Sequence, residues 1–325
     1  MQVKVSGSPY ATCSLDSLHG QKLLIVASTG GHLSQAVRWA ERFGVHRDSV
    51  FVTFDSPQSR SLLANRRYVF LPYVAPRDWR GVLRFGRSLP VLAKREGVDA
   101  ILSTGAGVAL GCLAARRRGR PFYYLESVSR FHGPSLTGRV LALVPGVRRG
   151  TQHPSWSSRR WPYVGSLLTD YRVAVSEKRR DDRPLRLFVT LGTIAPYRFD
   201  RLVDRVVALL EPNDQVMWQL GSTVRDDLPG TCFLTMTHDQ YLEAASTSDA
   251  VISHSGVGTI LDLLEAGVSP VVVPRRKEFG EHVDDHQEQV ASALASLGLV
   301  TSVEANELVR SVLSNRPCIV SDLNL

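Results

Sequence analysis

Cysteines and long apolar runs are scarce in this chain of 325 residues. Its four cysteines, at positions 13, 112, 232 and 318, lie far apart and have the spacing of neither a disulfide framework nor a zinc site. The longest uncharged stretch, residues 100–115, is sixteen residues long and is interrupted by STGAG, which is too short for a membrane span. We therefore expect reduced thiols and a chain that is soluble or peripheral to a membrane.

An apolar leader and paired carboxylates are also missing. Residues 1–20 are polar, so we expect no secretory signal. The chain has no Asp-x-Asp pair that would hold a divalent ion beside a phosphate. Asp284 and Asp285 are adjacent, but neighbouring side chains diverge on a helix. We expect no metal site.

Apolar segments alternate with helical patterns through the whole chain, and 43% hydrophobic composition over this length suffices for two cores. This alternation predicts α/β domains with doubly wound parallel sheets. Strands are expected at residues 22–27, 49–54, 68–73, 99–103, 121–126, 185–193, 215–220, 231–236, 250–252 and 271–273, and later helices at 200–210, 238–246, 259–265 and 303–313. The polar segment 165–184 is predicted to link an N-terminal domain (1–164) to a C-terminal domain (185–325).

Positive charge is concentrated in the first half. Residues 1–150 contain 22 Lys and Arg against 8 Asp and Glu, whereas residues 183–325 contain 11 against 19. Such asymmetry favours an anionic membrane surface as partner of the first half. A solvated Arg-rich surface is the alternative. Nucleic acid is not expected, because aromatic residues are not interleaved with the arginines.

Residues 77–97 form a basic amphipathic pattern. Arg77, Arg80, Arg84 and Arg87 follow one helical stripe, and Pro90 is expected to kink or end the helix. This pattern is typical of a membrane-surface helix. An ordinary surface helix that packs Trp79 and its leucines on the sheet explains it equally well. The cluster of Arg116, Arg117, Arg118 and Arg120 is either a solvated helix end or a further membrane contact.

The most informative segment is residues 248–287, in which a short strand, a turn of small residues and a helix follow one another. Ser255, Gly256, Gly258 and Thr259 lie at the turn, where backbone N–H groups at a helix N-terminus favour a phosphate. Asp262 follows within the first two turns of the helix. A carboxylate there can bind both hydroxyls of a ribose.

This segment resembles the nucleotide-sugar half of family 28-like GT-B glycosyltransferases. It is similar to the catalytic subunit of the eukaryotic enzyme that adds the second N-acetylglucosamine to dolichol-linked sugar, and to bacterial capsule and exopolysaccharide transferases with PR, GEH and DDHQ motifs. The resemblance implies that the turn holds the UDP diphosphate, Asp262 the ribose, and Asp285, His286 and Gln287 the donor sugar. It implies further donor-binding residues at Gly192, Thr193, Gln219, Met236, His254 and Arg275.

The first half resembles the acceptor-side, membrane-recruiting partner of the same dolichol-pathway enzyme. The matching motifs are STGGH (28–32), STGAG (103–107), YLESVSR (124–130), TGR (137–139) and TQHPSW (151–156). The resemblance implies a single-chain fusion of both subunits, two Rossmann-like domains facing a cleft, and acceptor binding at Gly30, Gly31, Thr104 and Gly105. The eukaryotic partner carries a transmembrane anchor that this sequence lacks, so binding to the membrane surface is expected instead.

Two residues are candidates for the catalytic base. His32 follows a glycine turn after a strand, where doubly wound sheets place their sites, and its usual pKa suits proton removal near neutrality. It can also be a residue that only caps the helix. Glu126 ends another strand and is either a base or an anchor for its loop. Attack opposite the leaving group would invert the anomeric centre.

The function expected is that of an inverting, metal-independent hexosyltransferase without a cofactor. It would transfer a sugar from a UDP-sugar to a polyprenyl-diphosphate-linked saccharide or another glycan, in exopolysaccharide or cell-envelope assembly at the cytoplasmic face of the membrane. Arg275 or Arg276 can bind a uronate or neutralise the diphosphate, so the donor sugar, the acceptor and the oligomeric state stay open. A UDP-sugar epimerase and a non-catalytic nucleotide-sugar-binding scaffold are the alternatives.

Overall fold

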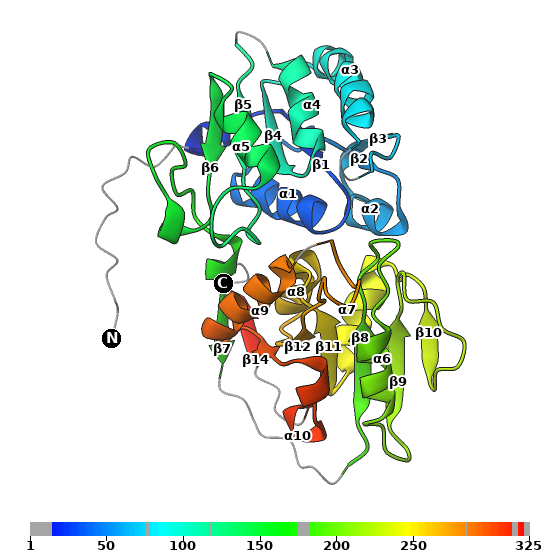
Figure 1. The fold of residues 1–325 in the computed structure, drawn as a ribbon. Helices are drawn as coiled ribbons and strands as arrows, with labels where there is room; N and C mark the ends of the chain where they lie inside the picture. The colour runs from blue at the N-terminus through cyan, green and yellow to red at the C-terminus, as the bar shows by residue number, and fades with distance from the viewer. Residues whose placement is uncertain are drawn as a thin grey trace. The chain divides into compact units, whose positions relative to one another are not determined.

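The computed structural model describes residues 15–75, 78–116, 119–174, 183–283, 285–313 and 318–321. The chain divides into two compact units. Met1–Ser59 and Leu63–Leu167 form unit 1, and Arg60–Leu62 and Leu168–Leu325 form unit 2. Each unit contains a six-stranded sheet with helices around it (Figure 1). The predicted α/β class with two doubly wound sheets is confirmed.

The sheet of unit 1 has the strand order β3-β2-β1-β4-β5-β6, and all its neighbouring strands are parallel. Its strands are β1 (Leu23–Ala27), β2 (Val50–Phe54), β3 (Arg67–Leu71), β4 (Ala100–Gly105), β5 (Phe122–Leu125) and β6 (Val147–Gly150). Five of them match the predicted segments. The sixth, β6, was not predicted, because Arg148 and Arg149 interrupt its apolar pattern.

Helices cover both faces of this sheet. They are η1 (Leu15–Leu18), α1 (Gly31–Arg42), α2 (Pro57–Leu62), α3 (Trp79–Arg95), α4 (Val108–Ala115), α5 (Leu136–Ala142) and η2 (Pro154–Trp156). Leu24 and Val26 of β1 belong to one buried cluster with Phe85 of α3 and Val108 of α4. Because side chains alternate along a strand, Leu23 and Ile25 face the opposite side, and both are fully buried.

Helix α3 runs through Pro90, so the expectation that this proline ends the helix is wrong. Asp78 caps its N-terminus, where the Asp78 carboxylate accepts a hydrogen bond from Gly81 N at 2.8 Å. On the buried side, a Cβ at Gly86 would lie 3.0 Å from Gly111 Cα of α4. This close packing of α3 on α4, together with the burial of Phe85 and Leu89, holds α3 in place despite the missing Pro90 N–H.

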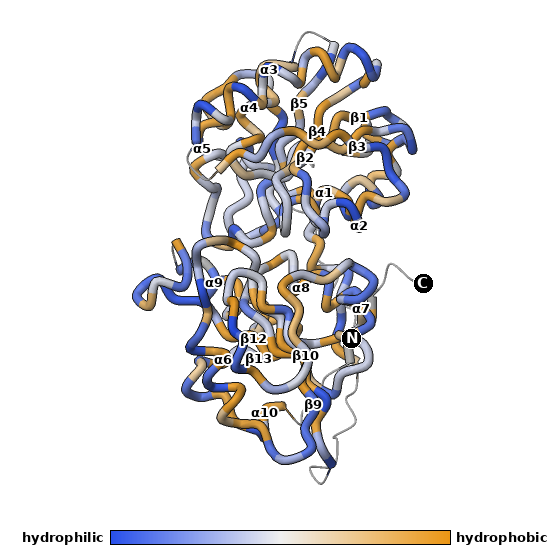
Figure 2. The backbone as a smooth tube through the Cα atoms, turned by 90° about the vertical axis from the view of Figure 1, so that its right-hand side faces the viewer, coloured by the Kyte–Doolittle hydropathy of each residue, from blue (hydrophilic) through white to orange (hydrophobic). Residues whose placement is uncertain are grey.

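Unit 2 repeats the same topology in the order β10-β9-β8-β11-β12-β13, again parallel throughout. Its strands are β8 (Arg186–Thr190), β9 (Gln215–Gln219), β10 (Thr231–Phe233), β11 (Ala250–His254), β12 (Val271–Val273) and β13 (Thr301–Ser302). Its helices are η3 (Leu167–Asp170), α6 (Asp200–Val207), α7 (His238–Thr247), α8 (Val257–Glu265), α9 (His286–Ser296), η4 (Ala305–Glu307) and α10 (Arg310–Leu313). In Figure 2 the strands of each sheet are largely hydrophobic.

Two segments of unit 2 differ from the expectation. Residues 303–313 were predicted as one helix, but they form η4 and the short α10, separated by the extended Leu308. The reason is that Val303 N bonds to Val272 O beside β12 and Leu308 is fully buried, so the segment follows the sheet edge. The predicted linker contains β7 (Tyr171–Ala174), which pairs antiparallel with β14 (Cys318–Ser321). Residues 175–182 of that linker lie outside the described residues.

Both sheets reverse their winding direction at an inner strand pair. The reversal lies between β1 and β4 in unit 1 and between β8 and β11 in unit 2. Loops that leave the carboxyl ends of such a pair diverge to opposite faces, and ligands of doubly wound folds bind in the crevice between them. The GGH and TGAG motifs follow β1 and β4, and the LGT and HSGVG motifs follow β8 and β11.

Candidate functional site

The turn between β11 and α8 brings buried polar groups to a helix N-terminus. Gly256 is the N-cap of α8, and its preceding residues His254 and Ser255 are buried. His254 Nδ1 and Ser255 Oγ are shielded from solvent and have no hydrogen-bond partner among the described residues. Unsatisfied buried polar groups beside the unpaired N–H groups of a helix end are suited to an anion such as a phosphate.

The turn after β8 packs on the same histidine. A Cβ at Gly192 would lie 3.0 Å from His254 Nε2, and a Cβ at Gly256 would also contact that ring. Only glycine therefore lets both turns approach His254 so closely. Burial, and next the charge of Arg275, lower the pKa of His254 to about 3. The imidazole is neutral at physiological pH.

Three consecutive backbone N–H groups after β12 are bound by side chains of the GEH and DDHQ motifs. Arg275 N donates to Gln287 Oε1 at 3.2 Å, Arg276 N to Glu281 Oε2 at 2.9 Å, and Lys277 N to Asp285 Oδ1 at 2.8 Å. The motif thus organises its own loop. Asp285 and Gln287, expected at the donor sugar, have this structural contact in addition to that predicted role.

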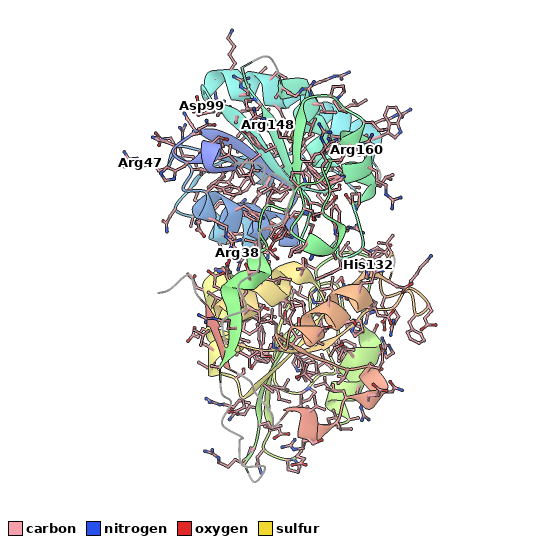
Figure 3. All side chains as sticks on the ribbon, turned by 90° about the vertical axis from the view of Figure 1, so that its left-hand side faces the viewer. Arg38, Arg47, Asp99, His132, Arg148 and Arg160 are labelled. Carbon is pink, nitrogen blue, oxygen red and sulfur yellow. The ribbon has the colours of Figure 1, made fainter. Side chains whose placement is uncertain are left out.

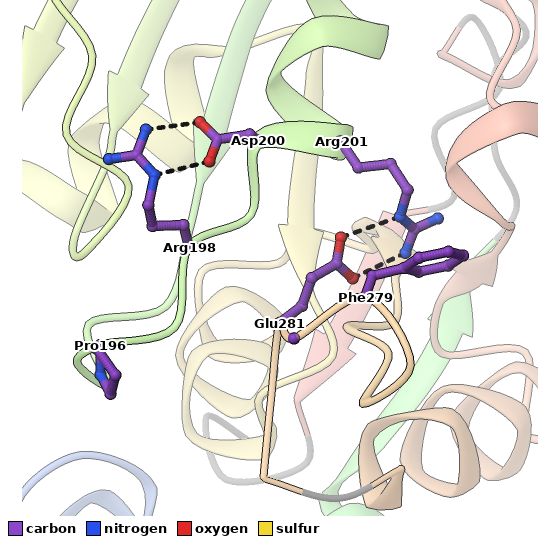
Figure 4. A pocket seen from close by; sticks show the side chains of 7 residues that line it. Pro196, Arg198, Asp200, Arg201, Phe279 and Glu281 are labelled. Carbon is purple, nitrogen blue, oxygen red and sulfur yellow. Dashed lines mark hydrogen bonds and ion pairs between the residues drawn. The ribbon is translucent and has the colours of Figure 1, made fainter.

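Glu281 was not among the predicted site residues, although it stands in the GEH motif. Its carboxylate accepts from Arg201 Nε at 3.0 Å and Nη2 at 2.9 Å, beside the exposed ring of Phe279 (Figure 4). These residues line a small pocket together with Pro196, Arg198 and Asp200. The bidentate pair fixes the loop that carries the predicted donor-sugar residues. The side chain of His286 and the whole of Asp284 lie outside the described residues.

The two arginines after β12 have different surroundings. Arg276 forms ion pairs with Glu288 and Glu304. Its guanidinium is therefore already neutralised, which argues against its pairing with a uronate. Arg275 is fully buried, and its Nη2 donates to Gly192 O at 3.2 Å. Arg275 thus binds the turn after β8 directly.

The remaining predicted donor residues lie on strands, turns and helices of unit 2. Gln219 at the end of β9 accepts a hydrogen bond from Thr190 Oγ1 of β8 at 2.9 Å. Met236 is buried in a cluster with Tyr241, and Asp262 is buried on α8. Burial, followed by the charge of Asp262, raises the pKa of the Tyr241 hydroxyl. Thr193 is exposed, whereas Gly258 is buried and Thr259 is half-buried.

In unit 1 the structure brings His32 together with the predicted acceptor residues of the TGAG motif. His32 Nδ1 lies 2.9 Å from Thr104 O, and Thr104 Oγ1 donates to His32 O at 2.7 Å. Gly105 has a φ of 126°, and a Cβ there would lie 2.7 Å from His32 Cε1. The turn after β4 therefore closes on the ring of His32. Gly30 has a φ of 74° and is the N-cap of α1, and Gly31 begins that helix.

Glu126, the second candidate base, is 1% exposed and its carboxylate is saturated with donors. It accepts from Ser135 N at 2.9 Å, Ser135 Oγ at 3.0 Å, Tyr124 Oη at 3.0 Å and Ser127 N at 3.2 Å. Burial nevertheless raises the pKa of Glu126. This arrangement favours the interpretation that Glu126 anchors the start of α5.

A buried polar network beside Glu126 was not predicted. Gln152 Nε2 donates to Gln35 Oε1 at 3.2 Å and to Glu126 O at 3.0 Å, while Val128 N donates to Gln35 Oε1 at 2.9 Å. His153 Nε2 lies 2.6 Å from Val128 O. The network ties α1 to the loops after β5 and β6. In the sequence, the network could have been found from Gln35, a glutamine at a buried position of α1, and from the TQH sequence (151–153) that follows β6.

The basic arginines of unit 1 have divergent environments. Arg80, Arg84 and Arg87 are exposed on α3, where Trp79 is 64% and Leu83 55% exposed. Trp79 and Leu83 therefore do not pack on the sheet, as the alternative expected, whereas Leu89 of the same helix is buried in the core as it expected. Arg120 is buried and donates to Val98 O and Ala93 O, so the predicted arginine cluster is not uniformly solvated; Arg77, Arg117 and Arg118 lie outside the described residues. Arg47, Arg148 and Arg160 lie on other parts of unit 1 (Figure 3).

Neither a metal cluster nor a membrane-spanning helix is found in the described part of the chain. No three His, Cys, Asp or Glu side chains converge there as metal ligands. None of its helices is both long enough and apolar enough to cross a bilayer.

Comparison with known proteins identifies the family. Residues 186–317 match the model of the glycosyltransferase family 28 C-terminal domain. A Burkholderia mallei relative is 30% identical in an alignment of 325 positions that covers 90% of this chain and 86% of the relative. The chain belongs to glycosyltransferase family 28. The relative is named UDP-N-acetylglucosamine--N-acetylmuramyl-(pentapeptide) pyrophosphoryl-undecaprenol N-acetylglucosamine transferase.

Further matches cover different lengths of this chain. A Burkholderia ambifaria relative with the same name is 28% identical in an alignment of 244 positions that covers 68% of this chain and 63% of that relative. The crystal structure of Acinetobacter baumannii MurG has a TM-score of 0.53 and 21% identity, covering 90% of this chain and 89% of that chain. This likeness shows the fold. The predicted GT-B fold and family 28-like glycosyltransferase class are confirmed, and the residue roles stay predictions.

Proposed function

We propose that this chain transfers a sugar from a UDP-sugar to a polyprenyl-diphosphate-linked saccharide, with inversion and without a metal ion. The observation that carries the proposal is the convergence of Gly192, His254 and Gly256 at the reversal of the unit 2 sheet. The glycines let both turns pack on His254 at the N-terminus of α8. The backbone N–H groups of that helix end suit a diphosphate, and Asp262 follows on the same helix. Relatives named as UDP-N-acetylglucosamine transferases support this sugar nucleotide as the first donor to test.

Departure of UDP leaves negative charge on its β-phosphate. The N-terminus of α8 and the buried guanidinium of Arg275 would stabilise that charge through fixed dipoles and one cation. This is chemistry that a helix end performs without a divalent ion. A single displacement at an α-linked UDP-sugar would then give a β-linked product.

The acceptor hydroxyl must lose a proton, and His32 is the residue that we assign to accept it. A carbonyl can only accept a hydrogen bond, so the contact with Thr104 O requires Nδ1 to carry the ring proton in neutral His32. The tautomer is thereby fixed with Nε2 unprotonated, which is the form required of a general base.

The lipid acceptor requires access to a membrane surface, and we assign this contact to the outer face of α3. That face combines the exposed side chains of Trp79, Leu83 and Val91 with Arg84 and Arg87. Aromatic and aliphatic side chains bordered by arginines suit the headgroup region of an anionic bilayer. We therefore propose a peripheral enzyme at the cytoplasmic face, working in cell-envelope or exopolysaccharide assembly.

The test is a transfer assay in anionic vesicles that contain an undecaprenyl-diphosphate-linked saccharide. UDP-N-acetylglucosamine and other UDP-sugars are supplied in turn, with and without EDTA. We expect a lipid-linked product with an inverted anomeric centre, formed equally well with EDTA. Conversion of the UDP-sugar without acceptor would indicate an epimerase instead, and nucleotide binding without any turnover would indicate a scaffold.

A further inference from the structure

Arg275 is a cation in the interior of unit 2. It follows β12 and is 0% exposed. Its Nη2 donates to Gly192 O at 3.2 Å and its Nη1 lies 3.4 Å from Tyr197 O. Both carbonyls belong to the segment between β8 and α6. A single guanidinium thus holds both ends of the turn that carries Gly192 and Thr193.

The guanidinium of Arg275 has no carboxylate partner among the described residues. No ion pair joins it to a carboxylate in the part of the chain that the structure describes. Glu281, which acts on it electrostatically, is bonded to Arg201 (Figure 4). Arg275 Nε is buried without a hydrogen-bond partner, and the ring of Phe199, 5.4 Å from the guanidinium carbon, offers only a cation–π contact.

An uncompensated buried charge is costly, and proteins normally pair it. Burial lowers the pKa of Arg275 to about 10, which still leaves the guanidinium charged at neutral pH. A buried cation without a carboxylate partner among the described residues is expected at a site where a ligand supplies the anion.

The position of the guanidinium agrees with that ligand being the diphosphate. A Cβ at Gly192 would lie 3.0 Å from His254 Nε2 and 3.2 Å from Arg275 Nη2. His254 in turn contacts Gly256, the N-cap of α8. The cation, the neutral imidazole and the helix N-terminus therefore lie side by side. Arg275 is the charged member of this group.

We infer that Arg275 is a positioning residue for the leaving group: it binds the carbonyl groups of the Gly192 turn and supplies positive charge beside the UDP diphosphate. This inference rests on the proposed function and deepens it. Because Arg275 is buried, it acts through the turn and through its electric field, not by direct contact with the sugar. The pairing of a uronate with Arg275 is replaced by this role.

The experiment separates charge from hydrogen bonding in one side chain. Arg275→Gln keeps amide donors for the two carbonyls but removes the charge, whereas Arg275→Lys keeps the charge. Affinities for UDP, UMP and uridine are measured by calorimetry. We expect Arg275→Gln to weaken the binding of UDP by about tenfold or more and the binding of uridine by less than about twofold, because only the phosphates interact with the charge that is lost. Arg275→Lys should keep the ratio of UDP to uridine affinity within about threefold of the wild type.

Arg276→Gln is the matched control. It removes the same formal charge from the next residue, and Arg276 is already paired with Glu288 and Glu304. It should leave the ratio of UDP to uridine affinity unchanged. The inference would be overturned if Arg275→Gln lowered the affinities for UDP and uridine equally, or if it left the affinity for UDP unchanged. If Arg275→Gln does not fold, a ratio of UDP to uridine affinity that falls more than about threefold in Arg275→Lys overturns the inference. Wild-type protein that binds no UDP contradicts the proposed function itself.

Discussion

His32 and Thr104 bind each other through two reciprocal hydrogen bonds, from the His32 ring to the Thr104 carbonyl and from the Thr104 hydroxyl to the His32 carbonyl. The two residues are 72 positions apart; His32 follows β1 and Thr104 lies at the end of β4, and these strands are the pair at which the sheet of unit 1 reverses. The sheet topology therefore both places the imidazole and selects its tautomer.

Replacing His32 tests its assignment as base. We expect His32→Ala to lower kcat by about 10²- to 10⁴-fold, the usual contribution of a general base, with the Kd of UDP unchanged. The measurements are steady-state kinetics and UDP calorimetry. His46→Ala is the control, because His46 is exposed in the same unit beside Asp48. Activity of His32→Ala within a few fold of the control would remove His32 from the mechanism.

Glu126 should behave as an anchor. Glu126→Ala leaves Ser135 N, Ser127 N and the Tyr124 hydroxyl without their acceptor, so we expect a loss of about 3 kcal/mol in the free energy of unfolding. Glu126→Gln retains an acceptor oxygen and should keep kcat within about threefold of the wild type. Urea unfolding and the transfer assay measure the two effects. A stable Glu126→Gln protein without activity would restore Glu126 as the base.

His254 should make the protein sensitive to acid. Its pKa is about 3 in the folded protein and about 6.5 in the unfolded chain, so the unfolded state binds more protons between these values. Stability is then fully present above about pH 6.5 and falls as the pH drops towards 3, by about 2 kcal/mol at pH 5. His254→Gln lacks this titration. Urea unfolding at pH 7 and pH 5 should show a smaller loss in the variant, and equal losses would contradict the assignment of a neutral buried imidazole.

The outer face of α3 should carry the membrane contact. We expect Trp79→Ser combined with Leu83→Ser to weaken binding to anionic vesicles by at least about tenfold, because two exposed apolar side chains no longer enter the interface. Sedimentation with vesicles measures this, and activity on a water-soluble acceptor should be unaffected. Leu297→Ser, which removes an equally exposed leucine of unit 2, is the control. Equal binding by the double variant and the control would exclude this face.

Much of the fold could be predicted from the sequence because the inner strands are short apolar runs and the turns after them consist of small residues. The segments of β1, β4, β8 and β11 were found in this way, and with them the two sets of turns at which the sheets reverse. Strand β6 was not predicted, because Arg148 and Arg149 interrupt the apolar pattern of this edge strand.

The candidate site was predicted less completely, because the environment of a side chain depends on distant segments. Arg275 and Arg276 are equivalent in the sequence, yet one is enclosed by Gly192, Tyr197 and Phe199 and the other is paired at the surface. The residues next to Arg275 and Arg276 in the sequence do not show which of the two is buried. The saturation of Glu126 by Ser135 and Tyr124 likewise follows from tertiary packing.

The most direct measurement is a crystal structure of the protein with UDP bound. Our account predicts the β-phosphate at the backbone N–H groups that begin α8, next to Gly192, and the ribose at Asp262. Well-defined UDP bound in unit 1, or in unit 2 away from Gly256 and Asp262, would contradict it.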